Sequence, residues 1–187
     1  RFFVDDNRSR PLIGQVMERI AARRIGKEIL MGPTHIWVEN KDLPEFSGDL
    51  PRVLRFISLA NLNNLRIGQQ TWQSIRSAMQ EREPTGSDSD SIGAFLSLMS
   101  RGSRLAPLLR RLHELRIIEQ LIPDFKRTRG LLQFNAYHKY TVDAHCFRAV
   151  EAATDFADES TAMGRRYRRL KDKTLLHLAL LIHDIGK

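Results

Sequence analysis

The sequence predicts an all-α fold. Three features support this class: the helical spacing of the apolar residues, the presence of only one brief strand candidate, and a hydrophobic content sufficient for a core. From residue 50 onward, apolar residues recur at intervals of three and four, which is the spacing of one helix face. Residues 34–39 (THIWVE) form the best strand candidate, because they alternate briefly between apolar and polar. Hydrophobic residues make up 42% of the 187 positions, which is enough for a core. We therefore expect an almost purely helical protein with at most one short strand pair near residues 35–39.

The first third of the chain carries two helix signals. Residues 11–25 place apolar side chains near helical spacing. A second helix is expected over 50–62, where Asp49 offers a carboxylate to a free backbone N–H and Pro51 fits the first turn. The apolar stripe of this second helix consists of Leu50, Val53, Leu54, Ile57 and Leu62.

Further stretches extend the prediction to residue 125. Thr71 is placed to cap a helix over 71–80. Residues 81–93 (EREPTGSDSDSIG) interrupt the apolar pattern with Pro, Gly, Ser and Asp, so a solvated loop is expected there. Helical spacing resumes at 92–100 and again at 104–125, where Leu and Ile alternate with Arg and Glu.

Three helical stretches follow toward the end of the chain. Thr141 is a suitable N-cap for a helix over 141–157, whose first turn holds Asp143 at the positive end of the helix dipole. Residues 164–173 (GRRYRRLKDK) contain six Arg or Lys, and we favour a solvated face over a docking site for an acidic partner. The last helix (TLLHLALLIHDI) is expected to stop at Gly186.

Charge and cysteine content restrict the possible partners and compartments. The formal net charge is +8 and the pI is about 10.1, which suits an acidic partner such as nucleic acid, a nucleotide or phosphate. An equally weighted interpretation is a fragment whose acidic portions lie elsewhere in a longer chain. Cys146 is the only cysteine, so an intramolecular disulfide is excluded and a cytoplasmic location is expected. No apolar run reaches the roughly 18 residues of a membrane span.

An ionisable pair stands at the end of the most apolar segment. In residues 174–187 (TLLHLALLIHDIGK), His183 and Asp184 follow a run of leucine and isoleucine that should be buried. Burying either group unpaired costs several kcal/mol, so a compensating partner is needed. A metal ion, a cationic side chain, or emergence of the helix end into solvent would each provide it, and the pair by itself leaves all three open.

A second histidine-bearing segment favours the metal. Residues 137–151 (YHKYTVDAHCFRAVE) contain His138 and His145, seven residues apart across a predicted helix start. One histidine from this helix and a His-Asp pair from another would make a mixed nitrogen and oxygen metal site. Such ligands suit Mn, Fe or Zn, and also Mg where more carboxylate and water take part. The alternative for His145 is a capping or core histidine.

These residues resemble the HD family of metal-dependent phosphohydrolases. His145 matches the first histidine of the family's His…His-Asp…Asp ligand set, and His183 with Asp184 (LLIHDIGK) matches its central pair. The resemblance implies a helical bundle in which these three residues hold a divalent metal and Asp184 is catalytic. Mg or Mn is expected first, with Fe and Zn as options. The last aspartate of the family's set would lie beyond Lys187.

A narrower resemblance is to the bifunctional uridylyltransferase/uridylyl-removing enzymes, which modify the nitrogen-signalling protein PII. Residues 137–151 are similar to that family's H-x-Y-T-V-D-E-H stretch, except that Ala144 replaces Glu. Residues 105–125 (LAPLLRRLHELRIIEQLIPDF) resemble the family's LRRMHELGVLGRYLPEF, and the likeness covers roughly 47–187. The matching residues of the first motif are His138, Tyr140, Thr141, Val142, Asp143 and His145.

This resemblance implies an internal fragment of a longer enzyme of nitrogen regulation. Residues 1–46 would follow a missing upstream domain, 47–130 would form a helical connecting region, and 131–187 would begin an HD domain. The parent enzyme would add UMP from UTP to PII in a nucleotidyltransferase domain and remove it in the HD domain. The fragment alone is expected to be inactive, and neither a membrane nor a nucleic acid is expected as a partner. The letters TGSDSDS at 85–91 resemble a transferase signature, but their spacing is wrong and a loop is expected.

Two alternatives stay open: an HD hydrolase of another nucleotide, such as an alarmone, and a non-catalytic helical module that binds a partner or nucleotide. His138 and Lys187 are weaker candidates for binding substrate or phosphate. We expect His113 to be exposed on an amphipathic helix, and His177 to be a packing or surface residue on a different face from His183.

Overall fold

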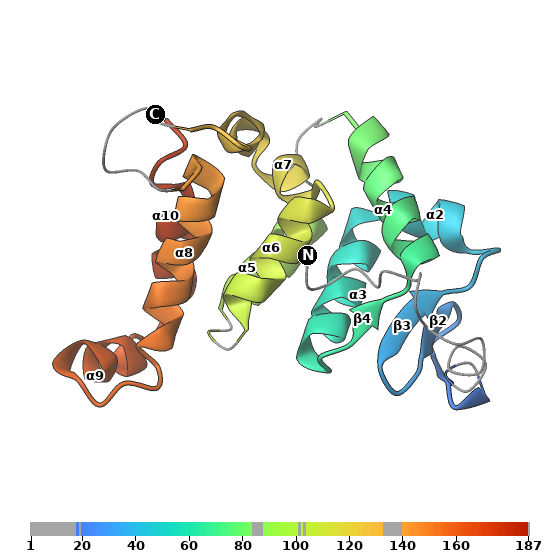
Figure 1. The fold of residues 1–187 in the computed structure, drawn as a ribbon, viewed down its shortest axis with the longest axis horizontal. Coiled ribbons are helices and arrows are strands. Elements are labelled where there is room, and N and C mark those ends of the chain that lie inside the picture. Colours follow the sequence, from blue (N-terminus) through green and yellow to red (C-terminus); the bar gives the residue numbers. More distant parts are fainter. Residues whose placement is uncertain are drawn as a thin grey trace. The chain divides into compact units, whose positions relative to one another are not determined.

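The computed structural model describes residues 18, 20–83, 88–100, 102, 104–132 and 140–186 (Figure 1). These residues are predominantly helical, as predicted, with one small sheet. The chain divides into two compact units, Arg1–Glu83 with Glu114–Arg116, and Pro84–His113 with Ile117–Lys187. The domain boundaries expected after residues 46 and 130 stay a prediction. In the described part of the chain, none of the helices combines the length and apolar character that crossing a membrane requires.

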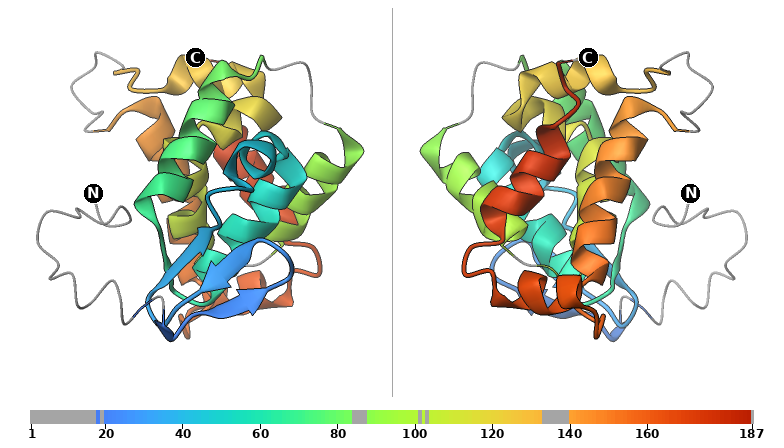
Figure 2. Two further views of the ribbon diagram at one scale, coloured as in Figure 1. Left: turned by 90° about the vertical axis from the view of Figure 1, so that its right-hand side faces the viewer. Right: turned by 90° about the vertical axis from the view of Figure 1, so that its left-hand side faces the viewer.

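The first unit combines a four-stranded sheet with three helices. Its strands are β1 (Arg23–Ile25), β2 (Ile29–Met31), β3 (His35–Val38) and β4 (Arg66–Ile67), and its helices are α2 (Leu43–Gly48), α3 (Leu50–Leu62) and α4 (Gln69–Glu81). The sheet order is β1-β2-β3-β4, with β4 parallel to β3 and the other pairs antiparallel (Figure 2). Gly26 has a φ of +66° in the turn between β1 and β2, a conformation that glycine adopts without steric cost.

The sheet corrects the sequence prediction in two places. The strand expected near residues 35–39 exists as β3, but it belongs to four strands rather than to at most one pair. The other strands have only two or three residues, too few for an alternating pattern to show. The helix expected over 11–25 is wrong at its end, because Arg23–Ile25 is strand β1. Residues 11–17 and 19 lie outside the described residues.

Helix α3 follows the prediction closely. Its N-cap is Asp49, whose Oδ1 accepts the backbone N–H of Arg52 at 2.9 Å, and Pro51 stands in the first turn. Four of the five predicted stripe residues are buried, namely Leu50, Val53, Leu54 and Ile57. Leu62, the fifth, is 54% exposed, since the helix ends there and its last side chain passes the edge of the core.

Thr71 does not cap α4. The helix starts two residues earlier, with Gly68 at the N-cap position, so Thr71 lies inside its first turn. The Thr71 side chain is buried, and its hydroxyl accepts the backbone N–H of Val38 in β3 at 3.0 Å. The threonine therefore joins helix to sheet, a tertiary use of a hydroxyl that local sequence cannot distinguish from a cap.

The second unit is built from helices. They are α5 (Ser89–Met99), α6 (Leu105–Glu114), α7 (Ile117–Leu121), the 3-10 helix η1 (Pro123–Thr128), α8 (Val142–Asp155), α9 (Ala162–Arg169) and α10 (Thr174–Ile182). The loop expected over 81–93 is shorter than predicted, because Asp88 caps α5 by accepting the N–H of Ser91 at 2.7 Å. Residues 84–87, which hold the first three of the seven transferase-like letters, lie outside the described part.

Helices α8 and α10 pack against each other, and α10 also contacts α5 (Figure 2). The chain runs along α8, turns through α9 and returns along α10, so the start of α8 lies beside the end of α10. Thr141 occupies the predicted N-cap position of α8, although its side chain makes no capping hydrogen bond. Helix α10 ends at Ile182, four residues before the predicted stop at Gly186.

His177 is a packing residue, one of the two roles expected for it. It is fully buried on α10, where its Nδ1 lies 2.6 Å from the carbonyl oxygen of Met99 on α5. Its Nε2 lies 2.9 Å from the hydroxyl of Tyr167 on α9. Because a carbonyl only accepts, Nδ1 carries the proton and Nε2 accepts from the tyrosine. The histidine thus connects three helices through two buried hydrogen bonds.

The cap of α3 yields a test of the first unit. Replacing Asp49 with alanine should lower the free energy of unfolding by about 1 kcal/mol, because the Arg52 amide loses its partner. Trp37 and Trp72 both lie in this unit, so urea unfolding followed by tryptophan fluorescence reports on it. Asp42→Ala is the matched control, because the Asp42 side chain makes no capping bond to α2. Equal losses in the two variants would contradict the capping role.

Candidate metal centre

The buried stripe of α10 leads directly into the predicted site. His177, Leu181 and Asp184 are 0%, 0% and 5% exposed, and they follow one another at intervals of four and three. Asp184 is therefore on the packed side of the chain although the helix has ended at Ile182. The prediction that the apolar run is buried holds for Leu181 but is wrong for Ile182, which is 39% exposed.

The structure brings together the three residues predicted from sequence. His145 comes from the first turn of α8, and its Nε2 lies 3.2 Å from the Nε2 of His183. The same His145 nitrogen lies 3.8 Å from Asp184 Oδ2. His183 Nε2 lies 3.5 Å from Asp184 Oδ1. One ligand atom from each residue lies within 4.8 Å of the others, and we call this group the candidate metal centre.

The backbone orients the His183 ring. Its Nδ1 lies 2.8 Å from the carbonyl oxygen of Leu180, one turn earlier in α10. Since the carbonyl can only accept, the ring proton is on Nδ1 and the lone pair of Nε2 points toward His145 and Asp184. A hydrogen bond of this kind, from one ring nitrogen to a backbone carbonyl, is the usual way in which proteins fix the tautomer of a metal-binding histidine.

The donor set fits a divalent ion. Ligands at about 2.1 Å from one ion lie roughly 3 to 3.5 Å from each other in common geometries, close to the three separations here. Two imidazole nitrogens and one carboxylate suit Mn, Fe or Zn, and Mg when water completes the shell. Asp184 is buried while both histidines are partly exposed, so the group has a protected side and an open side.

Two weaker candidates cannot be placed. His138 and Lys187 both lie outside the described residues, so their predicted contact with phosphate stays a prediction. The basic run of α9 has partly structural roles. Arg165 donates to the carbonyl of Ser160 at 2.7 Å, and Arg168 donates to the carbonyl of Ala157 at 2.9 Å. These two arginines thus hold the turn between α8 and α9.

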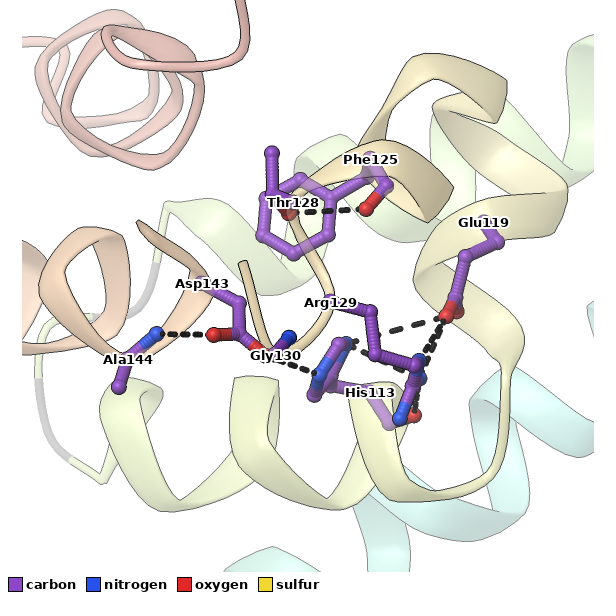
Figure 3. Close-up of polar contacts among 8 residues, drawn as sticks. All are labelled: His113, Glu119, Phe125, Thr128, Arg129, Gly130, Asp143 and Ala144. Atoms are coloured by element: carbon purple, nitrogen blue, oxygen red, sulfur yellow. Dashed lines mark hydrogen bonds and ion pairs between the residues drawn. The ribbon is translucent and has the colours of Figure 1, made fainter. Parts of the chain in front are cut away.

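His113 was predicted to be exposed, and this is wrong. It is 8% exposed, and its Nε2 lies 3.0 Å from Asp143 Oδ2 in the first turn of α8 (Figure 3). Burial alone would raise the pKa of the Asp143 carboxyl. Hydrogen bonds from the side chains of His113 and Thr141, and from two backbone amides, outweigh burial and lower that pKa below its usual value. The surrounding arginines and leucines of α6 suggested a solvated helix face, which concealed this contact.

Cys146 follows the candidate ligand His145 but faces the core. It is fully buried, and burial raises the pKa of its thiol to about 11. A thiol that stays protonated at neutral pH is neither a good nucleophile nor a good metal ligand. The candidate metal centre therefore contains nitrogen and oxygen donors without sulfur, which disfavours soft ions.

The sequence of this chain is similar to segments of known proteins. No protein-family model matches the chain. It is 30% identical over 148 residues to a bifunctional uridylyltransferase/uridylyl-removing enzyme of Caulobacter vibrioides. Proteins of the same name from Erythrobacter litoralis and Rhodopseudomonas palustris are 29% and 28% identical. In each case the match covers 76% of this chain and 16% of the relative.

The resemblance to the bifunctional uridylyltransferase/uridylyl-removing enzymes is therefore confirmed, while the resemblance to the HD family stays a prediction. The chain is homologous to a segment of the bifunctional uridylyltransferase/uridylyl-removing enzymes, and it spans about a sixth of their length. The relatives are named for adding and removing a uridylyl group, so they are enzymes.

The state of Cys146 can be tested by alkylation. At about pH 8, a pKa of about 11 leaves roughly a thousandth of the thiol ionised, and burial further limits access. Iodoacetamide should therefore label the native protein far more slowly than the urea-unfolded chain, by about a hundredfold or more. Mass spectrometry of timed samples measures both rates. Native labelling as fast as unfolded labelling would show that the thiol is accessible and reactive.

Proposed function

We propose that this chain supplies part of a metal-dependent phosphohydrolase site of the HD type, which in the longer relatives removes UMP from the PII protein. The observation that carries the proposal is the convergence of His145, His183 and Asp184 at the meeting ends of two antiparallel helices. Homology to enzymes named as uridylyl-removing supports the substrate class. The partners would be PII with UMP and UTP, in the cytoplasm.

Each residue of the candidate metal centre would have a definite part. His145 and His183 would present Nε2 lone pairs, the second held by its bond to Leu180. Asp184 would contribute negative charge from a buried position, which strengthens its attraction for a cation. When bound, a divalent ion, foremost Mg or Mn with Fe or Zn as options, would neutralise phosphate charge and make a nearby water more acidic. The open side formed by the two exposed histidines would admit the phosphodiester.

Other residues would interact with the negative charge of the substrate. His138 and Lys187 are proposed to contact phosphate, on the grounds of their places in the two motifs. The chain's net charge of +8 favours anionic substrates in general, including the alternative of another nucleotide. A non-catalytic helical module is the remaining alternative, and it would not need any affinity for metal.

Metal binding separates a metal-dependent hydrolase site from the non-catalytic module. Mn²⁺ added to the chain should bind with an affinity that falls at least about tenfold in His145→Ala, which removes a nitrogen donor, and in Asp184→Asn, which removes the negative charge of the carboxylate. The electron paramagnetic resonance signal of free Mn²⁺ measures the bound fraction. Asp158→Asn is the control, because Asp158 is an exposed acid in the turn at the other end of α8. Absence of Mn²⁺ binding, or equal loss in the control, would reject the metal centre.

The activity is tested in a protein that carries this segment within the full length of its relatives. The double change His183→Ala, Asp184→Ala should slow removal of UMP from PII about a thousandfold or more, because two metal ligands are lost. Addition of UMP should persist, since the proposed site serves only removal. Intact-mass measurement of PII follows both half-reactions. If the double variant removed UMP from PII at the original rate, the assignment of this site to UMP removal would be wrong. Loss of both addition and removal would indicate a folding role for the end of α10.

A further inference from the structure

A chain of buried and part-buried polar contacts runs from α7 to the first turn of α8. Glu119 on α7 accepts a hydrogen bond from Arg129 Nε at 2.7 Å, and its Oε1 lies 2.5 Å from Arg129 Nη2 in an ion pair (Figure 3). The same guanidinium donates from Nη2 to the backbone carbonyl of His113 and lies 3.1 Å from its Nδ1. His113 in turn reaches Asp143. Neither the candidate metal centre nor its proposed chemistry uses any of these four residues.

The direction of these hydrogen bonds follows from the guanidinium. Because Arg129 can only donate, Nδ1 of His113 accepts, and the ring proton is on Nε2. Nε2–H therefore donates to Asp143 Oδ2. One carboxylate, Glu119, thus fixes the arginine, the arginine fixes the histidine tautomer, and the histidine anchors the second carboxylate, Asp143.

Asp143 is held at the start of α8 from three sides. Its Oδ1 accepts the N–H of Ala144 at 2.9 Å, and its Oδ2 accepts the N–H of Gly130 at 3.2 Å in addition to His113. Gly130 has a φ of +66°, so the turn that aims its amide at the carboxylate favours glycine. Next to it, the N–H of Val142 donates to the carbonyl of Leu131 at 2.9 Å. These bonds join the backbone on the two sides of residues 132–141.

Aromatic packing restricts the histidine ring further. The centroid of His113 lies 5.7 Å from that of Phe125 on η1 and 5.1 Å from that of Phe147 on α8. The two phenylalanine rings are themselves 5.7 Å apart. Two aromatic neighbours and a hydrogen-bond partner on each nitrogen thus restrict the orientation of the His113 ring.

We propose that His113 is a positioning residue for the candidate metal centre, an inference that rests on the proposed function. Through Asp143 it fixes the first turn of α8, and with that turn the place from which His145 reaches the other two candidate ligands. Only Ala144 separates Asp143 from His145, so a displacement of the anchored turn moves the ligand with it. Arg129 and Glu119 act by holding the histidine in the tautomer that donates to Asp143.

The test uses the whole chain and two measurements on each variant. His113→Phe keeps the aromatic packing but removes the donor to Asp143, whereas His113→Gln retains an amide N–H near the position of Nε2. Amide hydrogen exchange over residues 144–147 should accelerate about tenfold in His113→Phe and return toward the original rate in His113→Gln. Mn²⁺ affinity of the folded protein should fall about tenfold in the first variant and recover in the second.

Glu151→Gln is the matched control. It removes the charge of Glu151 on α8, whose carboxylate oxygens accept from Arg110 on α6 at 3.1 Å (Nη1) and 2.6 Å (Nη2). This ion pair joins the same two helices away from the first turn of α8. This control should change neither the amide hydrogen exchange over residues 144–147 nor the affinity of the protein for Mn²⁺. If His113→Phe does not fold, Arg129→Met takes its place, because methionine has no N–H to donate to His113 and the Arg129 side chain is 25% exposed.

The possible results distinguish this inference from the proposed function. If the unchanged protein binds no Mn²⁺, the proposed function fails, and hydrogen exchange alone decides whether His113 holds the turn. If the unchanged protein binds Mn²⁺ and His113→Phe binds it equally well, the positioning role is overturned while the metal centre stands. Equal effects of His113→Phe and His113→Gln would also overturn it, because a loss that the amide donor does not restore reflects packing alone.

Discussion

The antiparallel pairing of α8 with α10 is the constraint on which the candidate metal centre depends. Each helix has one buried stripe, and the stripe of α10 continues past the helix end to Asp184. Because the chain reverses through α9, the first turn of one helix meets the last turn of the other. A carboxylate on a packed stripe is costly unless polar atoms from the partner helix face it, and His145 provides such atoms. The site is thus an extension of the helix interface.

Local signals in the sequence predicted the parts of the fold that depend on local chemistry. Asp49 before a proline and an apolar stripe is enough to predict α3, because capping and helix periodicity act within a few residues. The close approach of His145 to His183 and Asp184 was also expected, but from residue types and resemblance rather than from any local rule. Nothing in periodicity fixes the distance between two helices that are separated along the chain.

The failures involve residues whose partners are distant in the sequence. Thr71 is a residue type that commonly caps helices, yet its hydroxyl accepts the backbone N–H of Val38 in β3. His113 stands among arginines on what reads as a solvated face, yet it is buried by Phe125, Phe147 and Asp143. Strands β1, β2 and β4 are too short to leave a pattern. In each case tertiary packing decides between uses that the local sequence allows equally.

The separation of the candidate ligands along the chain has a consequence for folding. His183 and Asp184 are neighbours, but His145 lies 38 residues before His183. In an unfolded chain, bringing the two ends of a loop of that length together costs conformational entropy that no packing contact yet offsets. An ion would therefore meet the adjacent donors His183 and Asp184 but not His145. High affinity for an ion at the candidate metal centre would arise only after α10 has docked on α8. An ion at this site would therefore arrive late in folding, and its free energy of binding would be added selectively to chains that have already assembled the helix pair.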